Sequence, residues 1–338
     1  MRPLVLLDAD VLGRERTGDE TYVTNLLREL PALAPDLRFA AVTRRPELVP
    51  EGVEAIHLPA RSQELRMAWA VPRLLRRLRP AVAHFQHSFP LGFRGRGVVT
   101  VHDLSFERDA TTMGRLERLV FRAVVPRSAR RAACVLTVSQ RTKRDLIDLY
   151  GIPESRIVVT PNGVDRAFTP GNGPVQGRGY VLFVGAIQER KNPLAAADAA
   201  AAVGLPLVVV GPEKDEALAR ALARRGADLR GYVERGELAE LYRGAAALVM
   251  PSRFEGFGLP LLEAMACGTP VVATPDPALR EVAGDAVLFA EPHELGAALA
   301  RAIADRDRLA AAGIVRAAGF SWRRTAELTL AAYREVLA

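Results

Sequence analysis

Short apolar runs rich in valine, isoleucine and leucine alternate along the chain with stretches of alanine, leucine and arginine that repeat at helical spacing. Uninterrupted apolar runs of this length are typical of parallel strands, which are buried on both faces. In the first half, the pattern predicts strands at residues 4–7, 39–43, 82–85, 98–101, 134–138 and 157–160. In the second half, it predicts strands at residues 180–184, 207–210, 229–231, 247–250, 271–273 and 286–289. This order is typical of two doubly wound α/β domains, each with helices on both faces of its sheet.

The junction between the two predicted domains is the turn-forming sequence Pro-Asn-Gly-Val-Asp at residues 161–165, followed by a glycine- and proline-rich stretch. A chain of 338 residues has room for two domains of about 150 residues each. We expect an N-terminal domain over residues 1–165 and a C-terminal domain over residues 170–320. The last segment, residues 322–338, has amphipathic helical spacing and follows Ser321, a suitable N-cap.

The net charge of +7 arises in the first 165 residues, where 26 lysines and arginines outnumber 19 acidic residues; the remainder has 20 of each. Much of the excess lies in two arginine-rich stretches with helical spacing, residues 73–79 and 115–131. Such stretches suit an anionic membrane or an acidic acceptor, and they suit a solvated helix face equally well. Nucleic acid is not expected as a partner, because the sequence contains no nucleic-acid-binding motif.

Cys134 and Cys267 are the only cysteines and lie far apart in the sequence, so neither a disulfide framework nor a cysteine-based metal site is expected. A reducing cytoplasm is the simplest location. The N-terminal apolar run is followed by Asp8 and Asp10, so it predicts a strand rather than a signal peptide. The most apolar stretch, residues 194–210, contains polar and helix-breaking residues and predicts a helix and a strand, not a membrane span.

The most informative loop is Pro-Ser-Arg-Phe-Glu-Gly-Phe-Gly-Leu-Pro-Leu-Leu-Glu at residues 251–263. It follows the strand that ends near Met250, and Pro260 suits the first position of a new helix. The carboxyl ends of parallel strands are where open α/β sheets bind ligands. Gly256 and Gly258 let the backbone approach a ligand closely, and amides at the helix start can donate to phosphate or sugar oxygens. A plain turn is the alternative, because short glycine motifs are common.

Two glutamates belong to this segment. Glu255 lies in the loop and Glu263 is placed in the first helical turn, so both carboxylates can face one cleft and accept hydrogen bonds from paired hydroxyls. The alternative for Glu263 is that it only complements the positive end of the helix dipole.

A second candidate loop, residues 185–193, follows the strand at residues 180–184. Asn192 is predicted to cap a helix whose first residue is Pro193. Arg190 and Lys191 then lie near the positive end of the helix dipole, which disfavours cations unless an anion is bound. A bound diphosphate would resolve this conflict, and full solvation of both side chains is the alternative.

His102 follows the strand at residues 98–101 and is therefore predicted at the ligand-binding end of that strand. A hydrogen-bonded structural histidine is the alternative. Ser139 is expected to cap the next helix rather than to bind phosphate. His84 and His87 flank the end of another strand, where packing in the core or at the surface is expected and a place on the acceptor side is the alternative.

The segment from Gly256 to Val272 closely resembles the signature of glycosyltransferase family 4, whose members are retaining enzymes of the GT-B fold. The resemblance implies two Rossmann-like domains that face each other across a cleft. It implies that Glu255 lies against the transferred sugar and that Glu263 holds the ribose hydroxyls of the nucleotide. The donor would also contact the backbone of four consecutive residues: Gly256, Phe257, Gly258 and Leu259.

The resemblance extends to the other candidate sites. It implies that Lys191 contacts the diphosphate, and Arg190 is expected to supply a second cation, because Ala186 stands where many members carry an arginine. It also implies that His102 lies near the 6-position of the donor sugar.

Three weaker matches complete the resemblance. Gly18 lies where the family has a glycine-containing loop near the diphosphate and the acceptor. Tyr232 and Val233 match the position whose backbone holds the nucleobase. The last helix would cross back to the N-terminal domain.

Together these implications predict a metal-independent, retaining hexosyltransferase that needs no cofactor besides its nucleotide diphosphate sugar. GDP-mannose and UDP-glucose are the leading donors, and the acceptor is expected to be a glycan or a lipid-linked molecule. Cations and helix N-termini would stabilise the leaving diphosphate in place of a metal ion. Front-face attack is preferred, although a covalent intermediate on Glu255 is chemically feasible.

Other functions remain open at this point. A nucleotide-sugar epimerase or phosphorylase could share the fold, and so could a non-catalytic nucleotide-sugar-binding protein. The glutamate pair, Lys191 and His102 argue against these alternatives. A dinucleotide-binding GxGxxG motif does not follow the first strand, and a Walker A motif is absent from the sequence.

Overall fold

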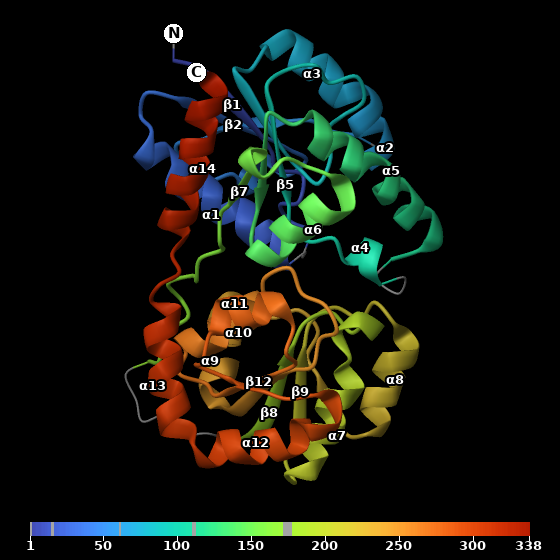
Figure 1. The fold of residues 1–338 in the computed structure, drawn as a ribbon, viewed down its shortest axis with the longest axis vertical. Coiled ribbons are helices and arrows are strands. Elements are labelled where there is room, and N and C mark those ends of the chain that lie inside the picture. Colours follow the sequence, from blue (N-terminus) through green and yellow to red (C-terminus); the bar gives the residue numbers. More distant parts are fainter. Residues whose placement is uncertain (1, 15–16, 61, 110–112, 172–177) are drawn as a thin grey trace. The chain divides into compact units, whose positions relative to one another are not determined.

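The computed structural model describes residues 2–14, 17–60, 62–109, 113–171 and 178–338, which form two compact units, each built around its own parallel sheet (Figure 1). Unit 1 comprises Met1–Leu104, Arg115–Gly163 and Trp322–Ala338. Unit 2 comprises Ser105–Gly114 and Val164–Ser321. The chain therefore contributes a short segment to unit 2 from within unit 1, then forms the main part of unit 2, and returns to unit 1 with its last helix.

Among the described residues, unit 1 has a seven-stranded parallel sheet in the order β3-β2-β1-β4-β5-β6-β7. The strands are β1 Leu4–Asp8, β2 Arg38–Thr43, β3 Glu54–His57, β4 Val82–Gln86, β5 Gly97–Val101, β6 Cys134–Thr137 and β7 Ile157–Val159. Six match the sequence prediction to within a residue or two. The sequence analysis missed β3, because this edge strand is largely exposed and lacks an apolar run.

The helices of unit 1 cover both faces of this sheet. They are α1 Thr17–Leu33, α2 Gln63–Leu65, the π-helix η2 Arg66–Ala70, α3 Val71–Leu78, α5 Arg115–Arg131, α6 Gln140–Tyr150 and α14 Trp322–Leu337. Successive side chains of β4 point to opposite faces of the sheet. Ala83 and Phe85 pack with α3 on one face, whereas His84 contacts α14 on the other. Both arginine-rich stretches are helical, as predicted.

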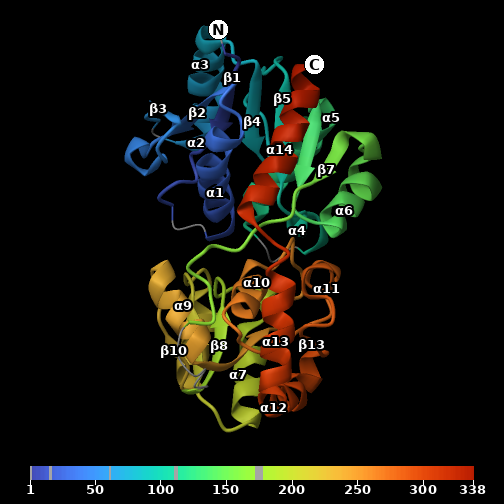
Figure 2. The same cartoon turned by 90° about the vertical axis from the view of Figure 1, so that its left-hand side faces the viewer.

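The last helix, α14, lies alongside α1 and over the strands of unit 1 (Figures 1 and 2). Trp322 meets Tyr22 of α1 edge to face, with ring centroids 6.4 Å apart. Beneath the helix, Tyr333 and His84 are both fully buried, and the Tyr333 hydroxyl lies 2.6 Å from His84 Nδ1. His84 Nε2 is in turn 2.7 Å from the Thr100 hydroxyl, so both ring nitrogens have partners.

Unit 2 has, among its described residues, a six-stranded parallel sheet in the order β10-β9-β8-β11-β12-β13. The strands are β8 Arg178–Val184, β9 Leu207–Val210, β10 Asp228–Leu229, β11 Ala245–Met250, β12 Val271–Ala273 and β13 Leu288–Phe289. All six were predicted: β9 and β12 match exactly, and the other four differ by one or two residues at one or both ends.

The helices of unit 2 that follow its strands are α7 Pro193–Ala202, α8 Glu216–Arg224, α9 Arg235–Gly244, α10 Leu259–Ala266, α11 Pro277–Ala283, α12 Leu295–Ala304 and α13 Arg306–Ala317. Alanine and leucine side chains of α7, α8 and α12 pack with β-strand residues such as Val181 and Val249 in one buried cluster. The four-residue helix α4 Ser105–Arg108 also belongs to this unit.

Each sheet reverses its strand order once, between β1 and β4 in unit 1 and between β8 and β11 in unit 2. At such a switch point, the loops that follow the two neighbouring strands turn to opposite faces and leave a crevice at their carboxyl ends. In unit 2 these loops are residues 185–192 and 251–258, and in unit 1 they precede α1 and follow β4. The fold thus brings both predicted unit 2 loops to one edge.

No helix in the described part of the chain is long and apolar enough to span a membrane. Cys134 and Cys267 are both buried and unpaired with each other, in agreement with the expectation that they form no disulfide.

The contact between His84 and Tyr333 yields a stability prediction. Tyr333→Phe leaves a buried imidazole nitrogen without a hydrogen-bond partner, which costs about 1–3 kcal/mol. Burial lowers the pKa of His84 to about 3, so protonation does not rescue the ring near neutral pH. Thermal unfolding followed by circular dichroism measures the loss.

Arg334→Ala is the matched control, because Arg334 lies on the same helix but is exposed, and its ion pair with Asp36 spans 3.6 Å at the surface. Such pairs contribute little, so we expect a change within about 0.5 kcal/mol. Equal melting temperatures for Tyr333→Phe and wild type would show that the buried contact does not hold α14 in place.

Candidate active site

The two predicted loops of unit 2 are joined by an ion pair between Lys191 and Glu255. Lys191 Nζ donates to Glu255 Oε1 at 2.6 Å, and Arg190 Nη1 lies 3.8 Å from Glu255 Oε2. Glu255 is only 5% exposed, so its charge requires a nearby cation. The loops therefore place one carboxylate and two cations at the switch point of the sheet.

Backbone contacts hold the same two loops together. Arg190 Nη1 donates to the carbonyl of Phe254 at 2.6 Å, and the Arg253 amide donates to the carbonyl of Arg190 at 2.9 Å. The Glu255 amide donates to Asp276 Oδ2 at 3.3 Å, while Asp276 caps α11. The position of Glu255 is thus fixed from both sides.

The ion pair differs from the prediction for Arg190 and Lys191. We expected Arg190 and Lys191 to need a bound diphosphate or solvent to offset the helix dipole, but the anion they face is Glu255 itself. Neither cation is fully solvated, since both side chains are largely buried. Sequence spacing could not reveal this pairing, because the partners are 64 residues apart.

The prediction that the Asn192 side chain caps a helix is also wrong. Residues Glu189–Lys191 form a 3₁₀ turn, η5, and Asn192 follows in the left-handed conformation with φ of 51°. Its side chain makes no capping hydrogen bond to α7, although Pro193 is the first helical residue as predicted. Asparagine is chosen here because it tolerates a left-handed backbone better than most residues.

Gly258 is required by its geometry. Its φ is 99°, and a Cβ atom built on it would lie 2.4 Å from Leu279 Cδ2. This turn starts α10 at Leu259, so Pro260 is the second helical residue and not the first. Glu263 consequently lies in the second turn of the helix, which corrects its predicted place in the first.

Phe257 is buried, and its ring packs against Phe320 with centroids 6.0 Å apart. Gly256 is buried as well. The Phe257 side chain therefore serves packing, and the donor contacts expected for the backbone of residues 256–259 stay a prediction. Leu259 is partly exposed at the helix start.

Glu263 has a different partner from Glu255. Its Oε2 accepts a hydrogen bond from the Tyr242 hydroxyl at 2.9 Å. Burial raises the pKa of Glu263 to about 7, with the Tyr242 bond and the nearby Arg235 acting in the opposite direction. A buried carboxyl group with a raised pKa, close to a candidate binding loop, is a candidate functional group.

The third unit 2 candidate follows β10. The ring of Tyr232 is 47% exposed, whereas Val233 is buried. Gly231, just before them, has φ of 62° and accepts a hydrogen bond from the Gly211 amide after β9. The segment is therefore tied to the same edge of the sheet as the other two loops.

In unit 1, His102 lies just beyond β5 and is largely buried. Its Nε2 lies 2.8 Å from Gln86 Oε1, and Tyr22 packs edge-on at 4.9 Å between ring centroids. Burial lowers the pKa of His102, and the negative charge of Asp19 opposes this effect. The imidazole is therefore held in a fixed orientation at the end of its strand.

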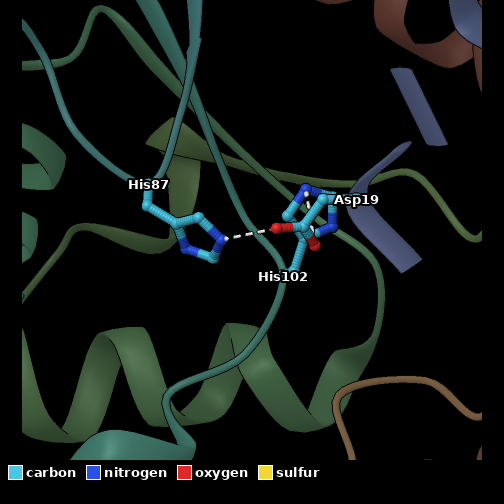
Figure 3. A group of neighbouring side chains, drawn as sticks. All are labelled: Asp19, His87 and His102. Atoms are coloured by element: carbon cyan, nitrogen blue, oxygen red, sulfur yellow. Dashed lines mark ion pairs between the residues drawn. The ribbon is translucent and has the colours of Figure 1, made fainter. Parts of the chain in front are cut away.

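Two neighbours of His102 were not predicted as functional residues. His87 Nε2 lies 3.5 Å from Asp19 Oδ2, and His102 Nε2 lies 3.8 Å from Asp19 Oδ1 (Figure 3). His87 has φ of 61°, a left-handed conformation that is uncommon for histidine. His87 was expected to serve packing, with a place on the acceptor side as the alternative, and the only signal for that alternative was its position after a strand.

The remaining unit 1 candidates have simpler roles. Gly18 is exposed in the first turn of α1, where an added Cβ would meet no atom within 4 Å. Its neighbour Arg16 lies outside the described residues. Ser139 caps α6 by accepting from the Thr142 amide at 3.1 Å, as predicted. His84 is a core residue, also as predicted.

Two family models match adjoining parts of the chain. The model described as Glycosyltransferase Family 4 matches residues 16–168, and the model described as Glycosyl transferases group 1 matches residues 165–314. Among the solved structures, the sucrose-phosphate synthase of Thermosynechococcus elongatus superimposes with a TM-score of 0.79 at 21% identity, covering 99% of both chains. The HepE protein of Anabaena, solved with UDP and glucose, gives a TM-score of 0.74 at 16% identity, covering 98% of this chain and 99% of that one.

These structural similarities establish the GT-B fold. A curated relative extends them to the sequence: the O-antigen chain mannosyltransferase B of Escherichia coli is 30% identical over 326 residues, covering 88% of this chain and 83% of its own length. With both halves matched by models and this relative aligned along nearly all of the sequence, the chain belongs to glycosyltransferase family 4.

Proposed function

We propose that this chain transfers a hexose, with retention of anomeric configuration and without a metal ion, from a nucleotide diphosphate sugar to a glycan or lipid-linked acceptor. The observation that carries the proposal is the buried Lys191–Glu255 pair at the switch point of unit 2. It supplies a cation for the diphosphate and a carboxylate for the sugar within one loop cluster.

In the proposed complex, the diphosphate accepts hydrogen bonds from Lys191, Arg190 and the amides at the start of α10. These groups are preorganised, so they can stabilise the charge that develops on the leaving diphosphate. Glu255 then faces the hydroxyls of the transferred sugar, and Glu263 accepts from the ribose. The backbone at Tyr232 and Val233 holds the nucleobase.

We assign the 6-position of the donor sugar to His102 and place Gly18 near the diphosphate and acceptor. Retention is proposed to proceed by front-face attack, in which the leaving diphosphate oxygen takes the proton of the acceptor hydroxyl. The C1–phosphate bond breaks as the acceptor oxygen bonds to C1 from the same side. In this route, Glu255 only holds the sugar and forms no covalent bond with it.

The comparisons support two donors. The name of the E. coli relative supports mannose as the transferred sugar, hence GDP-mannose. The Anabaena structure with UDP and glucose supports UDP-glucose.

The direct test is a thermal-shift screen against a panel of nucleotide sugars, followed by a transfer assay in the presence of EDTA. A donor at one hundred times its Kd should stabilise the folded chain by about 2.7 kcal/mol. Product with an inverted anomeric carbon, isomerised donor without transfer, or a requirement for added metal would each contradict the proposal.

The variants Glu255→Gln and Lys191→Ala separate the two halves of the ion pair. We expect Glu255→Gln to lower kcat by about 100-fold or more, because the sugar loses its charged acceptor while Lys191 stays available for the diphosphate. Lys191→Ala should weaken both turnover and nucleotide binding. Isothermal titration with the nucleoside diphosphate and initial rates measure the two effects.

Lys214→Ala is the control for the lysine substitution, because Lys214 is an exposed lysine of the same unit. It should leave both quantities unchanged. Wild-type turnover in Glu255→Gln would remove this carboxylate from the mechanism.

The raised pKa of Glu263 predicts a pH dependence of donor binding. In the unliganded chain this carboxyl is protonated below pH 7, and ribose hydroxyls donate best to its ionised form. Donor affinity should therefore rise about tenfold or more between pH 5.5 and pH 8, as the proton is released. Calorimetry with the intact nucleotide sugar measures this slope.

Glu263→Gln should flatten the pH profile, whereas Glu237→Gln, which removes an exposed carboxylate from α9, should not. Identical slopes in wild type and Glu263→Gln would separate Glu263 from the ribose.

We also propose that the chain works in the cytoplasm, at the inner face of an anionic membrane. Large apolar side chains are exposed on unit 1: Trp69 of η2 is 65% exposed, and Leu116 and Leu119 of α5 are 76% and 66% exposed. The loop after β4 links the two helices, because Leu91 donates to the Met67 carbonyl and Phe89 to the Ser128 hydroxyl. Arginines flank the leucines of α5. Exposed apolar side chains beside arginines fit an interface with anionic lipid.

Leu116→Glu combined with Leu119→Glu should reduce binding to phosphatidylglycerol vesicles by about tenfold or more, because two apolar contacts are lost and two like charges meet the lipid. Vesicle sedimentation measures the change. Val315→Glu on α13 is the control, since Val315 is 77% exposed on unit 2. Equal losses in both variants would contradict this assignment.

A further inference from the structure

The side chains of Asp19, His87 and His102 converge at the switch point of unit 1. They come from three separate elements: the first turn of α1, the residue after β4 and the residue after β5 (Figure 3). One potential ligand atom from each lies within 4.8 Å of the other two. All three side chains are partly buried, so water competes with them only from one side.

This set has the composition of a transition-metal site. Two imidazoles and one carboxylate are the ligands found in three-residue zinc sites, with the fourth position open to water or a ligand. Zinc–ligand bonds of about 2.0–2.1 Å place neighbouring atoms of a tetrahedral site about 3.4 Å apart. Asp19 presents one carboxylate oxygen to each histidine, Oδ2 at 3.5 Å from His87 Nε2 and Oδ1 at 3.8 Å from His102 Nε2. One potential ligand atom from each residue lies within 4.8 Å of the others, so a bound ion would draw the three side chains closer together.

The backbone conformation of His87 is a second, independent indication of a functional site. A histidine in the left-handed region carries a conformational cost, and such residues cluster at functional sites. Here the turn directs the imidazole of His87 toward Asp19, as the dashed line in Figure 3 marks. Packing alone would not need histidine at this position.

We propose that Asp19, His87 and His102 bind one zinc ion or a similar divalent transition metal. His102 Nε2 must then give up its contact with Gln86 Oε1, now 2.8 Å long, for the metal. Gln86 can turn its amide without losing another bond, because its Nε2 has no hydrogen-bond partner among the described residues.

One consequence rests on the proposed function. Since that transfer needs no metal and uses His102 to hold the donor sugar, zinc at this site inhibits the reaction rather than supporting it. Chelation reverses the inhibition.

The test is a calorimetric titration of chelator-treated protein with ZnCl₂, repeated with CoCl₂ to follow the visible absorption of a tetrahedral cobalt site. We expect one ion per chain. His87→Asn should weaken binding by at least about tenfold, since loss even of outer-shell partners costs that much. Asparagine tolerates the left-handed backbone, so this variant should keep its fold.

Asp19→Asn is a second variant on a different element, and it should weaken binding as well. His57→Asn is the matched control, because His57 is an exposed histidine of β3 in the same unit. No binding by wild type at 100-fold excess of zinc, or equal binding by His87→Asn and wild type, would overturn the metal site.

The titration does not measure transfer, so the two hypotheses fail separately. A chain that transfers sugar but binds no zinc refutes only the metal site. A chain that binds zinc through His87 but transfers no sugar refutes only the proposed function.

Discussion

The ion pair between Lys191 and Glu255 is the interaction on which the candidate site depends. A buried carboxylate is costly unless a cation pairs with it, and Glu255, which is 5% exposed, has Lys191 Nζ at 2.6 Å. The pair also ties the loop after β8 to the loop after β11, which the sheet order places side by side. A donor diphosphate would therefore enter a site that is already charged and held in place, and little reorganisation would be needed as the leaving group gains charge.

Unit 1 also gathers polar side chains at the switch point of its sheet, but their types differ from those in unit 2. Its switch point lies between β1 and β4, and the residues gathered there are an aspartate and two histidines instead of a lysine and a glutamate. Beneath them, His84 is bonded on both ring nitrogens and serves the core. Histidines only a few residues apart thus have different surroundings, because His84 belongs to β4 and contacts α14, whereas His87 follows the end of that strand.

Most errors in the sequence-based predictions arise from backbone angles or interaction partners that the local sequence does not specify. Local rules placed Asn192 as a side-chain cap and Glu263 in the first helical turn, and both assignments changed because backbone conformations at Asn192 and Gly258 are left-handed. The helix dipole predicted a bound anion beside Lys191, but the anion beside Lys191 is the Glu255 carboxylate. The edge strand β3 escaped notice because exposed strands carry no apolar run. The other errors concern a partner or a backbone angle, which local sequence rules do not specify.

The sequence by itself determined the two parallel sheets, nearly all strand positions, the glycine-containing loop and the family signature, because apolar periodicity and motif spacing are local properties. Only the tertiary structure decided which charges neutralise one another, that Tyr242 bonds Glu263, and that Asp19 and His87 join His102. The reason is geometric: parallel strands connected by helices bring residues such as Lys191 and Glu255, 64 positions apart, to one edge of a sheet. Spacing along the chain does not encode that proximity.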